Sequence, residues 1–208
     1  MRSILSLIAF LAVTSAYAVG KPVPLFNGKN FEGWEGDTEK TWRIEDGCIV
    51  GGSLDTQVPR NEFLCTKKTY GDFELTVKFK LLGDDKRNAG VQFRTQRIPN
   101  HHEVSGYQAD VGQDYWGALY DESRRKKVLV KPAKELVDKL AKKEDWNEYT
   151  IRCEGIKIQL KLNGTVTVDY TEEEANIDRT GIIGLQIHGG AKAKVFYKDI
   201  QIEELPSK

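Results

Sequence analysis

The sequence has little with which to build a strong charge field, a disulfide framework or a common metal motif. Lys plus Arg and Asp plus Glu each number 31, so no net charge attracts nucleic acid or an anionic membrane surface. Only three cysteines occur, Cys48, Cys65 and Cys153, and none forms the CxxC spacing of zinc or redox motifs. An exported chain can form one disulfide from them, the pair being undetermined, or bury all three as small hydrophobic side chains.

Long hydrophobic runs are also scarce, and the one clear run lies at the N-terminus. Ile4–Val13 follows the positive Arg2 and precedes Ala16-Tyr17-Ala18, an A-x-A cleavage pattern. This arrangement predicts a secretory signal peptide over residues 1–18, with a buried N-terminal helix as the alternative. The run is too short to span a bilayer and no second run follows it. We therefore expect a protein exported to the periplasm or the extracellular space, without a membrane span.

Repeats, low-complexity tracts and interdomain linkers are absent as well, which predicts a single domain over residues 19–208. Between Phe73 and Leu81, apolar and polar residues alternate as in a half-buried antiparallel strand. Asp46-Gly47 and Asn163-Gly164 each separate two alternating runs, which is a strong hairpin signal. Counting in this way gives about ten to twelve short strands, which indicate an all-β sandwich or barrel.

One basic segment departs from the strand pattern. Residues 124–143 contain nine basic residues and end in an amphipathic stretch, Pro132–Lys142. The segment is either a patch for an anionic partner or a short helix over a sheet edge with its lysines in water, and the helix is favoured.

Two expected strands between Asn88 and Asp121 carry an unusual set of polar side chains. Gln92, Arg94 and Gln96 alternate with apolar residues in the first strand, and Gln108 and Asp110 do so in the second. Because strand side chains alternate, each polar set lies on one face. Lysine, glutamate and threonine are typical of a solvated face. Arginine, glutamine and aspartate flanked by tyrosine and tryptophan indicate a site that hydrogen-bonds a polar uncharged ligand such as a sugar.

Ten motifs, in this order, resemble those of a known family: LFNGKNFEGW, WRIEDGCIVG, YGDFELTVKFKL, NAGVQFRT, GYQAD, GALYDE, WNEYTIRCEG, LNGTVTVDYT, GLQIHGG and YKDIQIEEL. They span Pro24 to Leu205, and although each motif alone is weak, ten in register are specific. The chain resembles the 3-keto-disaccharide hydrolase domain family of exported bacterial proteins. The resemblance implies a concanavalin A-like jelly roll, in which two curved antiparallel sheets place a sugar site on the concave face.

The resemblance also implies an activity on 3-keto-glycosides, which a sugar 3-oxidoreductase would supply. A carbonyl at C3 acidifies the proton at C2, so a base can remove that proton and the group on C1 can leave by β-elimination. Water then adds back, and the net reaction is hydrolysis. Such a site needs a base near C2, a donor for the enolate oxygen and an acid for the leaving group.

Asp110, His188 and Glu103 are the predicted catalytic residues. Asp110 is the first choice for a base, and the alternative is a structural carboxylate paired with Arg94. His188 lies in GLQIHGG, where glycines leave room for a ligand, and imidazole exchanges protons near neutral pH. The alternative for His188 is a structural role. Glu103 lies in a loop next to His101 and His102, where plain solvated residues are the alternative.

The predicted substrate-binding residues have polar or aromatic side chains close to these acids in the sequence: Gln92, Arg94, Gln108, Trp116, Tyr120, Glu122 and Gln186. Arg94 would orient hydroxyl groups or stabilise an enolate, and Trp116 would stack on a sugar ring. The alternatives are cross-strand hydrogen bonds for Gln92 and Gln108, a place in the core for Tyr120, and a salt bridge to Arg124 or Arg125 for Glu122.

No cofactor is certain, although His102, Glu103 and Asp110 are candidate ligands for a divalent metal that would polarise the C3 carbonyl. Their spacing matches no established metal motif. The chain also lacks the E-x-D-x-x-E strand of glucanases with this fold, which argues against a conventional retaining mechanism. Two other classes of function stay open: a non-catalytic sugar-binding module that uses the same face, and a structural domain of an extracellular assembly.

Overall fold

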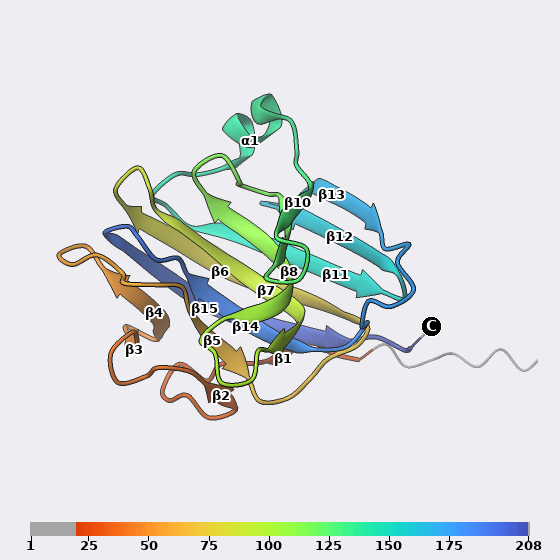
Figure 1. Cartoon of the computed structure of the whole chain (residues 1–208), viewed down its shortest axis with the longest axis horizontal. Helices are drawn as coiled ribbons and strands as arrows, with labels where there is room; N and C mark the ends of the chain where they lie inside the picture. The colour runs from red at the N-terminus through yellow and green to blue at the C-terminus, as the bar shows by residue number, and fades with distance from the viewer. Residues whose placement is uncertain (1–19, 208) are drawn as a thin grey trace, which may run out of the picture.

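The computed structural model describes residues 20–207, so the predicted signal peptide over residues 1–18 lies outside the described residues. Residues 20–207 form two antiparallel β-sheets packed face to face (Figure 1). Within them the only helix is α1 (Lys134–Leu140), and no helix is long and apolar enough to span a bilayer. The all-β, concanavalin A-like jelly roll expected from the sequence is confirmed.

Each sheet contains strands from distant parts of the sequence, because the chain passes back and forth between the two sheets. In spatial order, the eight-stranded sheet contains β13 (Thr165–Thr171), β12 (Lys157–Leu162), β11 (Asn147–Glu154), β6 (Phe73–Gly83), β15 (Ala193–Glu204), β4 (Cys48–Ser53) and β3 (Trp42–Glu45), with β1 (Val23–Pro24) paired to β15. The seven-stranded sheet contains β10 (Lys127–Val130), β9 (Leu119–Glu122), β8 (Val104–Gly112), β7 (Asn88–Arg97), β14 (Ile182–Ile187), β5 (Glu62–Thr66) and β2 (Trp34–Glu35).

Both predicted hairpins are confirmed. Asp46 and Gly47 have φ angles of 48° and 73° between β3 and β4, and Asn163 and Gly164 have φ angles of 50° and 81° between β12 and β13. Positive φ at both central residues matches the right-handed twist of the flanking strands, which is why Asp-Gly and Asn-Gly suit these turns.

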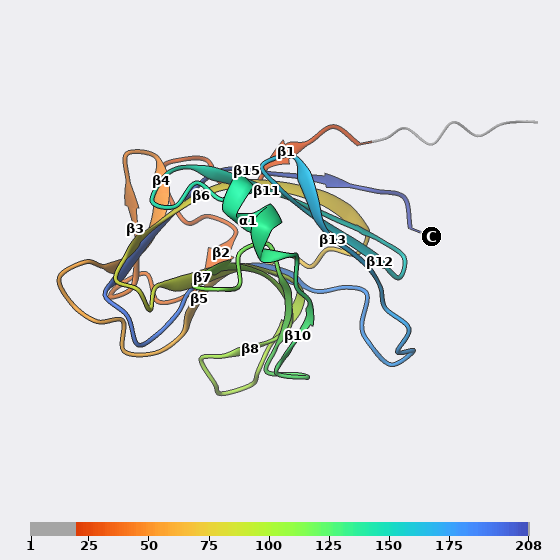
Figure 2. The same cartoon turned by 90° about the horizontal axis from the view of Figure 1, so that it is seen from above.

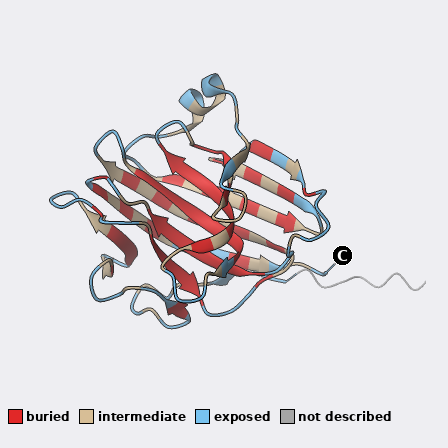
Figure 3. Ribbon diagram, in the orientation of Figure 1, coloured by how far each residue is buried: buried red, intermediate tan, exposed pale blue. Residues whose placement is uncertain are grey.

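The core lies between the sheets, and the two sheets differ in how they cover it. Strands β6 and β11 alternate buried and partly exposed residues, as expected of strands with one face in water. Strands β8 and β14 and most of β7 are buried almost continuously instead, which appears in Figure 3 as unbroken red strands. Polar side chains on the outer face of the seven-stranded sheet are therefore buried too.

The curvature of the seven-stranded sheet explains this burial. Seen from above, the β8 and β10 side of the sheet bends away from the layer that contains β5 and β7 (Figure 2). Side chains on the concave side of such a bend lie close together and shield one another from water. They are therefore buried although no helix in residues 20–207 packs over this face.

The structure supports the structural interpretation of the cysteines, as buried hydrophobic side chains, and of the basic segment, as a helix over a sheet edge. Cys48, Cys65 and Cys153 are free and buried, and burial raises the pKa of Cys65 and Cys153 to about 12, so these two thiols stay protonated. In α1, Val137 and Leu140 pack against the edge of the core, and the Asn163 side chain donates to the Leu140 carbonyl at 2.7 Å. The helix thus lies over a sheet edge.

Candidate active site

The candidate site lies on the hollowed outer face of the seven-stranded sheet, where neighbouring strands present polar side chains. Gln92 pairs with Gln108 across β7 and β8, and Gln108 pairs with Tyr120 across β8 and β9. Asp110 pairs with Gly90, which pairs in turn with Gln186 on β14. Directly paired residues of antiparallel strands project from the same face, so these side chains form one surface.

A row of amides connects β7 and β8 and ends at Asp110. The Gln92 Nε2 donates to the Gln108 Oε1, and the Gln108 side chain in turn hydrogen-bonds the Asp110 carboxyl group. Gly90 makes room for this row, since a Cβ at that position would lie 2.6 Å from the Gln108 Cδ. On the other side of the carboxyl group, the Asn88 Nδ2 donates to the Asp110 Oδ1 at 2.8 Å.

Burial leaves the Asp110 carboxyl group able to exchange a proton near neutral pH. Its pKa is raised to about 7, mainly by removal from water and also by the nearby Glu122 charge, although the hydrogen bonds from Asn88 and Gln108 act in the opposite direction. Only 5% of the residue surface is exposed, and no arginine or lysine forms an ion pair with the carboxyl group within residues 20–207. A carboxyl group in this state can accept a proton from carbon and release it again.

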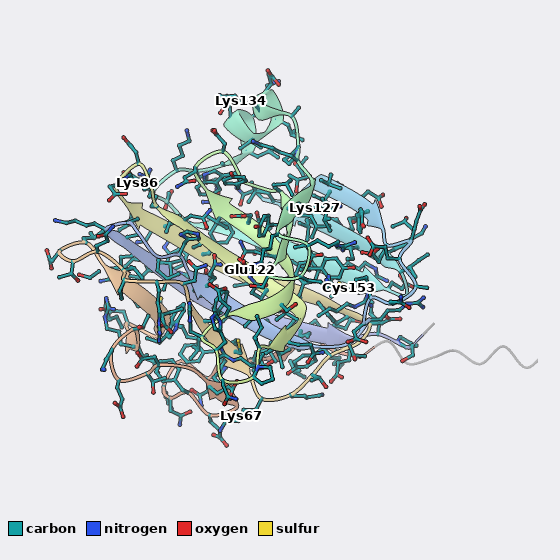
Figure 4. The ribbon with its side chains drawn as sticks, viewed as in Figure 1. Lys67, Lys86, Glu122, Lys127, Lys134 and Cys153 are labelled. Atoms are coloured by element: carbon teal, nitrogen blue, oxygen red, sulfur yellow. The ribbon has the colours of Figure 1, made fainter. Side chains whose placement is uncertain are left out.

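Glu122 at the end of β9 is a second carboxyl group of the same kind (Figure 4, label near the middle). Its pKa is raised to about 7, mainly by burial and also by the charge of Glu103, although a hydrogen bond from Gln186 acts in the opposite direction. The Gln186 Nε2 donates to the Glu122 Oε2 at 3.2 Å. Each of the two carboxyl groups is therefore held by a glutamine side chain, Asp110 by Gln108 of the same strand and Glu122 by Gln186 of β14, and both exchange their protons in the same pH range.

A cavity of about 220 Å³ opens over these groups. It is lined by Asn88, Gln108, Asp110, Gln113, Tyr115, Tyr120, Glu122 and His188. No lysine or arginine lines it, and its size suits one sugar ring rather than a longer saccharide. Tyrosine rings supply an apolar surface for such a ring, and the amides and acids supply its hydrogen bonds.

His188 enters the cavity from the end of β14 with one ring nitrogen fixed. Its Nδ1 lies 2.7 Å from the Gly189 carbonyl oxygen, so Nδ1 carries the proton in the neutral ring and donates to that oxygen. The Nε2 is then a free acceptor for a hydroxyl group or a proton of a ligand. Gly189 is required here because a Cβ would lie 2.5 Å from the Arg60 backbone.

The structure brings together most of the residues that the sequence singled out. Asp110, Gln108, Tyr120, Glu122 and His188 line the cavity. Gln92 and Gln186 lie fully buried beside it, and each leaves its Oε1 without a hydrogen-bond partner. The cross-strand hydrogen bond proposed as the alternative for Gln92 and Gln108 is present, and it serves to orient the Gln108 amide toward Asp110.

Arg94 is placed elsewhere, and this corrects the sequence interpretation. Its side chain, 2% exposed, forms an ion pair with Asp72 at 2.7 Å and donates to the carbonyls of Gly71 and Gly155. The cause is a β-bulge between Phe93 and Gln96, where Arg94 has a φ of 44°. The bulge breaks the two-residue alternation, so Arg94 neither joins the polar face nor pairs with Asp110.

Trp116 and the proposed metal ligands also differ from expectation. Trp116 is 4% exposed and packs in the core against Phe79, with ring centroids 6.0 Å apart, so it offers no platform to a sugar. Glu103 accepts from the Asn61 Nδ2 at 3.1 Å and faces the His102 Nε2 at 3.5 Å. In residues 20–207 no three His, Cys, Asp or Glu side chains are grouped to hold a metal ion, so His102, Glu103 and Asp110 do not form the proposed triad.

The alternative proposed for Glu122, a salt bridge to Arg124 or Arg125, is not formed, because Asp121 takes both arginines. Arg124 and Arg125 both bind Asp121, which is fully buried, so the Glu122 carboxyl group pairs with neither arginine and faces the cavity.

Sequence reasoning missed Asn88, Gln113 and Tyr115. Asn88 continues the polar alternation of β7 and was detectable from it, whereas Gln113 and Tyr115 lie in the turn after β8, where no periodicity guides a prediction.

Solved structures with this architecture include enzymes and a binding module. A protein of Parabacteroides distasonis ATCC 8503 described as a "putative glycosyl hydrolase" is 21% identical, with a TM-score of 0.66 over 88% of this chain and 93% of that one. The carbohydrate binding module CBM66 of Bacillus subtilis is 14% identical, with a TM-score of 0.62 over 83% and 96%. The catalytic domain of an endo-1,3-beta-glucanase (laminarinase) of Thermotoga petrophila RKU-1 is 11% identical, with a TM-score of 0.61 over 89% and 99%. At these identities the similarity shows the fold alone.

A comparison with curated proteins finds no match. The family model described as the 3-keto-alpha-glucoside-1,2-lyase-like domain matches residues 21–203, nearly the whole described chain and the family that the ten motifs resemble. The chain therefore belongs to the family of 3-keto-alpha-glucoside-1,2-lyase-like domains.

Proposed function

We propose that this protein cleaves 3-keto-glycosides by elimination at C1 and C2, followed by addition of water. The observation that carries the proposal is the pair of carboxyl groups, Asp110 and Glu122, which share one sugar-sized cavity and both have a pKa raised to about 7. Near neutral pH such a pair readily holds one proton between two groups, which supplies a base and an acid at once. The family and the fold support a carbohydrate-active protein, and this pair supports the elimination chemistry.

Asp110 acts as the base in this mechanism. Its carboxylate removes the C2 proton, whose acidity the neighbouring C3 carbonyl raises. The electron pair of the C2–H bond first passes to the C3 carbonyl, which becomes an enolate. As the carbonyl re-forms, this pair makes the C1–C2 double bond, and the C1–O bond breaks with its electrons on the leaving oxygen. The hydrogen bonds from Asn88 and Gln108 hold the carboxylate in one orientation, so little reorganisation accompanies the proton transfer.

Glu122 acts as the acid in its protonated form. It gives its proton to the leaving oxygen, which departs as an alcohol, and Asp110 keeps the proton taken from C2. The enolate oxygen at C3 accepts hydrogen bonds from neutral donors of the cavity, for which the second N–H of Asn88 and the hydroxyl group of Tyr120 are available. Water then adds across C1 and C2, with the reverse proton movements, and yields the free 3-keto-sugar.

His188 completes the site as an acceptor. Its Nδ1–H is fixed on the Gly189 carbonyl, so Nε2 orients a hydroxyl group of the sugar or the water that adds in the second stage. Glu103 contributes through its charge, which raises the pKa of Glu122 and so favours the protonated acid. In this role Glu103 is a positioning residue rather than one that touches the substrate.

The proposal extends to the place of this protein in the cell. The signal-like residues 1–18 support export to the periplasm or the extracellular space. The substrate requires an enzyme that oxidises the 3-hydroxyl group of a glycoside to a ketone, and a sugar 3-oxidoreductase is the class that does so.

The decisive experiment compares release of p-nitrophenol from the 3-keto-glucoside and from the plain glucoside. We expect turnover of the keto substrate alone and loss of that turnover in Asp110→Asn. Binding of both sugars without turnover would replace the proposal with the non-catalytic sugar-binding module. An arm with chelator tests the metal: sensitivity to it would return His102, Glu103 and Asp110 to consideration as ligands.

A further inference from the structure

The face of the eight-stranded sheet that points away from the core carries two half-buried aromatic rings among lysines. We call this surface the lysine–aromatic face; it comprises Lys78, Lys80, Trp146, Lys194, Phe196 and Lys198. Lys80 pairs with Phe196 and Lys78 pairs with Lys198 across β6 and β15, so these four side chains share one face, and Trp146 immediately precedes β11 beside them. In Figure 2, β6 and β15 lie in the layer opposite β7 and β8, so this face is remote from the cavity over Asp110.

The ammonium groups of this face lie over the aromatic rings. Trp146 and Phe196 meet edge to face, with centroids 6.4 Å apart. The Lys198 Nζ lies 4.0 Å from the centre of the Trp146 ring, and the Lys80 Nζ lies 5.2 Å from it and 4.7 Å from the centre of the Phe196 ring. Both aromatic residues are partly exposed, and aromatic rings that reach the surface within a polar sheet face can receive the apolar side of a ligand.

Part of the positive charge on this face is not neutralised. Lys78 pairs with Asp199 at 2.8 Å and Lys194 pairs with Glu45 at 2.7 Å. Lys80 and Lys198 have no carboxylate within ion-pair distance in residues 20–207, so their charge is available to a ligand. A partner that brings anionic groups to this face gains ion pairs without breaking existing ones.

A depression of about 450 Å³ continues the face toward α1. It is lined by Lys78, Lys142, Trp146, Asn147, Glu148, Asn163 and Lys198. The two asparagines are committed to the fold: Asn147 donates to the Lys142 and Asp145 carbonyls, and the Asn163 side chain donates to the Leu140 carbonyl. These hydrogen bonds hold the two asparagine side chains in place, so the groups available to contact a ligand are Lys142, Lys198 and the Trp146 ring.

We propose that the lysine–aromatic face binds an anionic polysaccharide, in which carboxylate or sulfate groups pair with Lys80, Lys142 and Lys198 while a sugar ring packs on Trp146. The spacing of separate cations around an aromatic ring suits a polymer that alternates rings and charges. The three acids on or beside the face, Glu45, Glu148 and Asp199, and the zero net charge favour this ligand over the closely spaced phosphates of nucleic acid. Such a contact would hold the protein on a charged glycan while the remote cavity works on released sugars.

Calorimetric titration with polygalacturonate, using the fully methyl-esterified form of the same polymer as the uncharged control, tests the proposal. We expect binding of the charged polymer alone, weakened by added salt. Lys80→Gln combined with Lys198→Gln should weaken it at least about tenfold, equivalent to about 1.4 kcal/mol. The matched control, Lys157→Gln with Lys161→Gln on β12, changes the net charge equally at another part of the sheet and should bind as the unaltered protein does.

Any of the following results with the ligands would overturn this proposal: no binding of polygalacturonate, equal binding of the esterified polymer, or tighter binding of a single-stranded oligonucleotide. Equal weakening in both double variants would also do so, since it would indicate a general charge effect. The outcome is independent of the chemistry at Asp110, because turnover of the 3-keto-glucoside should be the same in both double variants.

Discussion

The hydroxyl group of Tyr149 on β11 donates a hydrogen bond to the backbone carbonyl of Asp110 on β8, across the core of the sandwich. The same oxygen accepts from the Gly117 amide at 2.9 Å. Tyr149 is fully buried and burial raises its pKa, so it remains a neutral donor. The Tyr197 hydroxyl group likewise reaches β7 and β14, where its single proton is shared between the carbonyl oxygens of Gly90 at 3.0 Å and Gln186 at 2.8 Å. The eight-stranded sheet thus fixes the backbone of the site from behind.

Tyr149→Phe should therefore lower both stability and activity. It leaves the Gly117 amide with only its longer 3.3 Å contact to the Asp110 carbonyl. The loss should cost about 1–3 kcal/mol of unfolding free energy, measured by urea denaturation. Turnover of the 3-keto-glucoside should fall about tenfold, since Asp110 loses part of its support. The control is Tyr70→Phe, which alters a buried tyrosine that packs against Phe73. Unchanged turnover in Tyr149→Phe would refute the idea that the Tyr149 hydroxyl group supports the Asp110 backbone.

The two carboxyl groups should make the protein less stable as the pH rises through neutrality. Their pKa is about 7 in the folded protein, against about 4 in an unfolded chain. Between these values the folded state binds protons that the unfolded state has released. Stability from this source is complete below about pH 4 and is lost as the pH rises toward and past 7, by up to about 1.4 kcal/mol per pH unit for each group.

Thermal unfolding of Asp110→Asn with Glu122→Gln tests this sign. The variant should be more stable than the unaltered protein at about pH 8 and should lose the advantage at about pH 5. Comparison with the unaltered protein removes the opposite contribution of carboxylates such as Glu172, whose pKa is lowered to about 2 by Arg125 and Tyr107 despite burial. Asp169→Asn, at an exposed position, should show no such crossover, and a variant that is less stable at every pH would contradict the prediction.

Local patterns in the sequence were sufficient for the architecture and for much of the site. Asp-Gly and Asn-Gly turns locate hairpins because few other residues adopt positive φ, and alternation in Phe73–Leu81 identifies a half-buried strand. The same alternation placed Gln108 and Asp110 on one face. These features depend on residues close together in the chain, which is why one sequence reveals them.

Other features depend on contacts between distant segments. Nothing near Tyr149 in the sequence indicates that its hydroxyl group meets a strand 39 residues away. The bulge at Arg94 is stabilised by Asp72 and Gly155, on other segments, so alternation alone placed Arg94 on the wrong face. Trp116 resembles a sugar platform in sequence, but the packing of Phe79 from the other sheet makes it part of the core.

Arg94→Gln should separate a structural role from a binding role. The Arg94–Asp72 pair is almost fully buried, and loss of one partner should cost about 3–5 kcal/mol of unfolding free energy. Under conditions in which the variant stays folded, the KM for the 3-keto-glucoside should not change, because Arg94 is absent from the cavity lining. Arg43→Gln, in an exposed pair with Glu45, should cost less than about 1 kcal/mol. A raised KM in Arg94→Gln with normal stability would restore its assignment to the sugar.

The cavity over Asp110 should prefer neutral sugars to acidic ones. It contains two carboxyl groups and no lysine or arginine, so a sugar carboxylate placed there meets like charge without a compensating cation. At separations of several ångströms this costs about 1–3 kcal/mol, or about ten- to a hundredfold in affinity. Methyl glucoside and methyl glucuronide, which carry no ketone, allow the comparison by calorimetry without turnover. We expect weaker binding of the glucuronide at about pH 8 and a smaller difference at about pH 5, where both carboxyl groups are protonated. In Glu122→Gln the difference at about pH 8 should be smaller than in the unaltered protein. Equal affinities at about pH 8 would contradict the electrostatic description of the site.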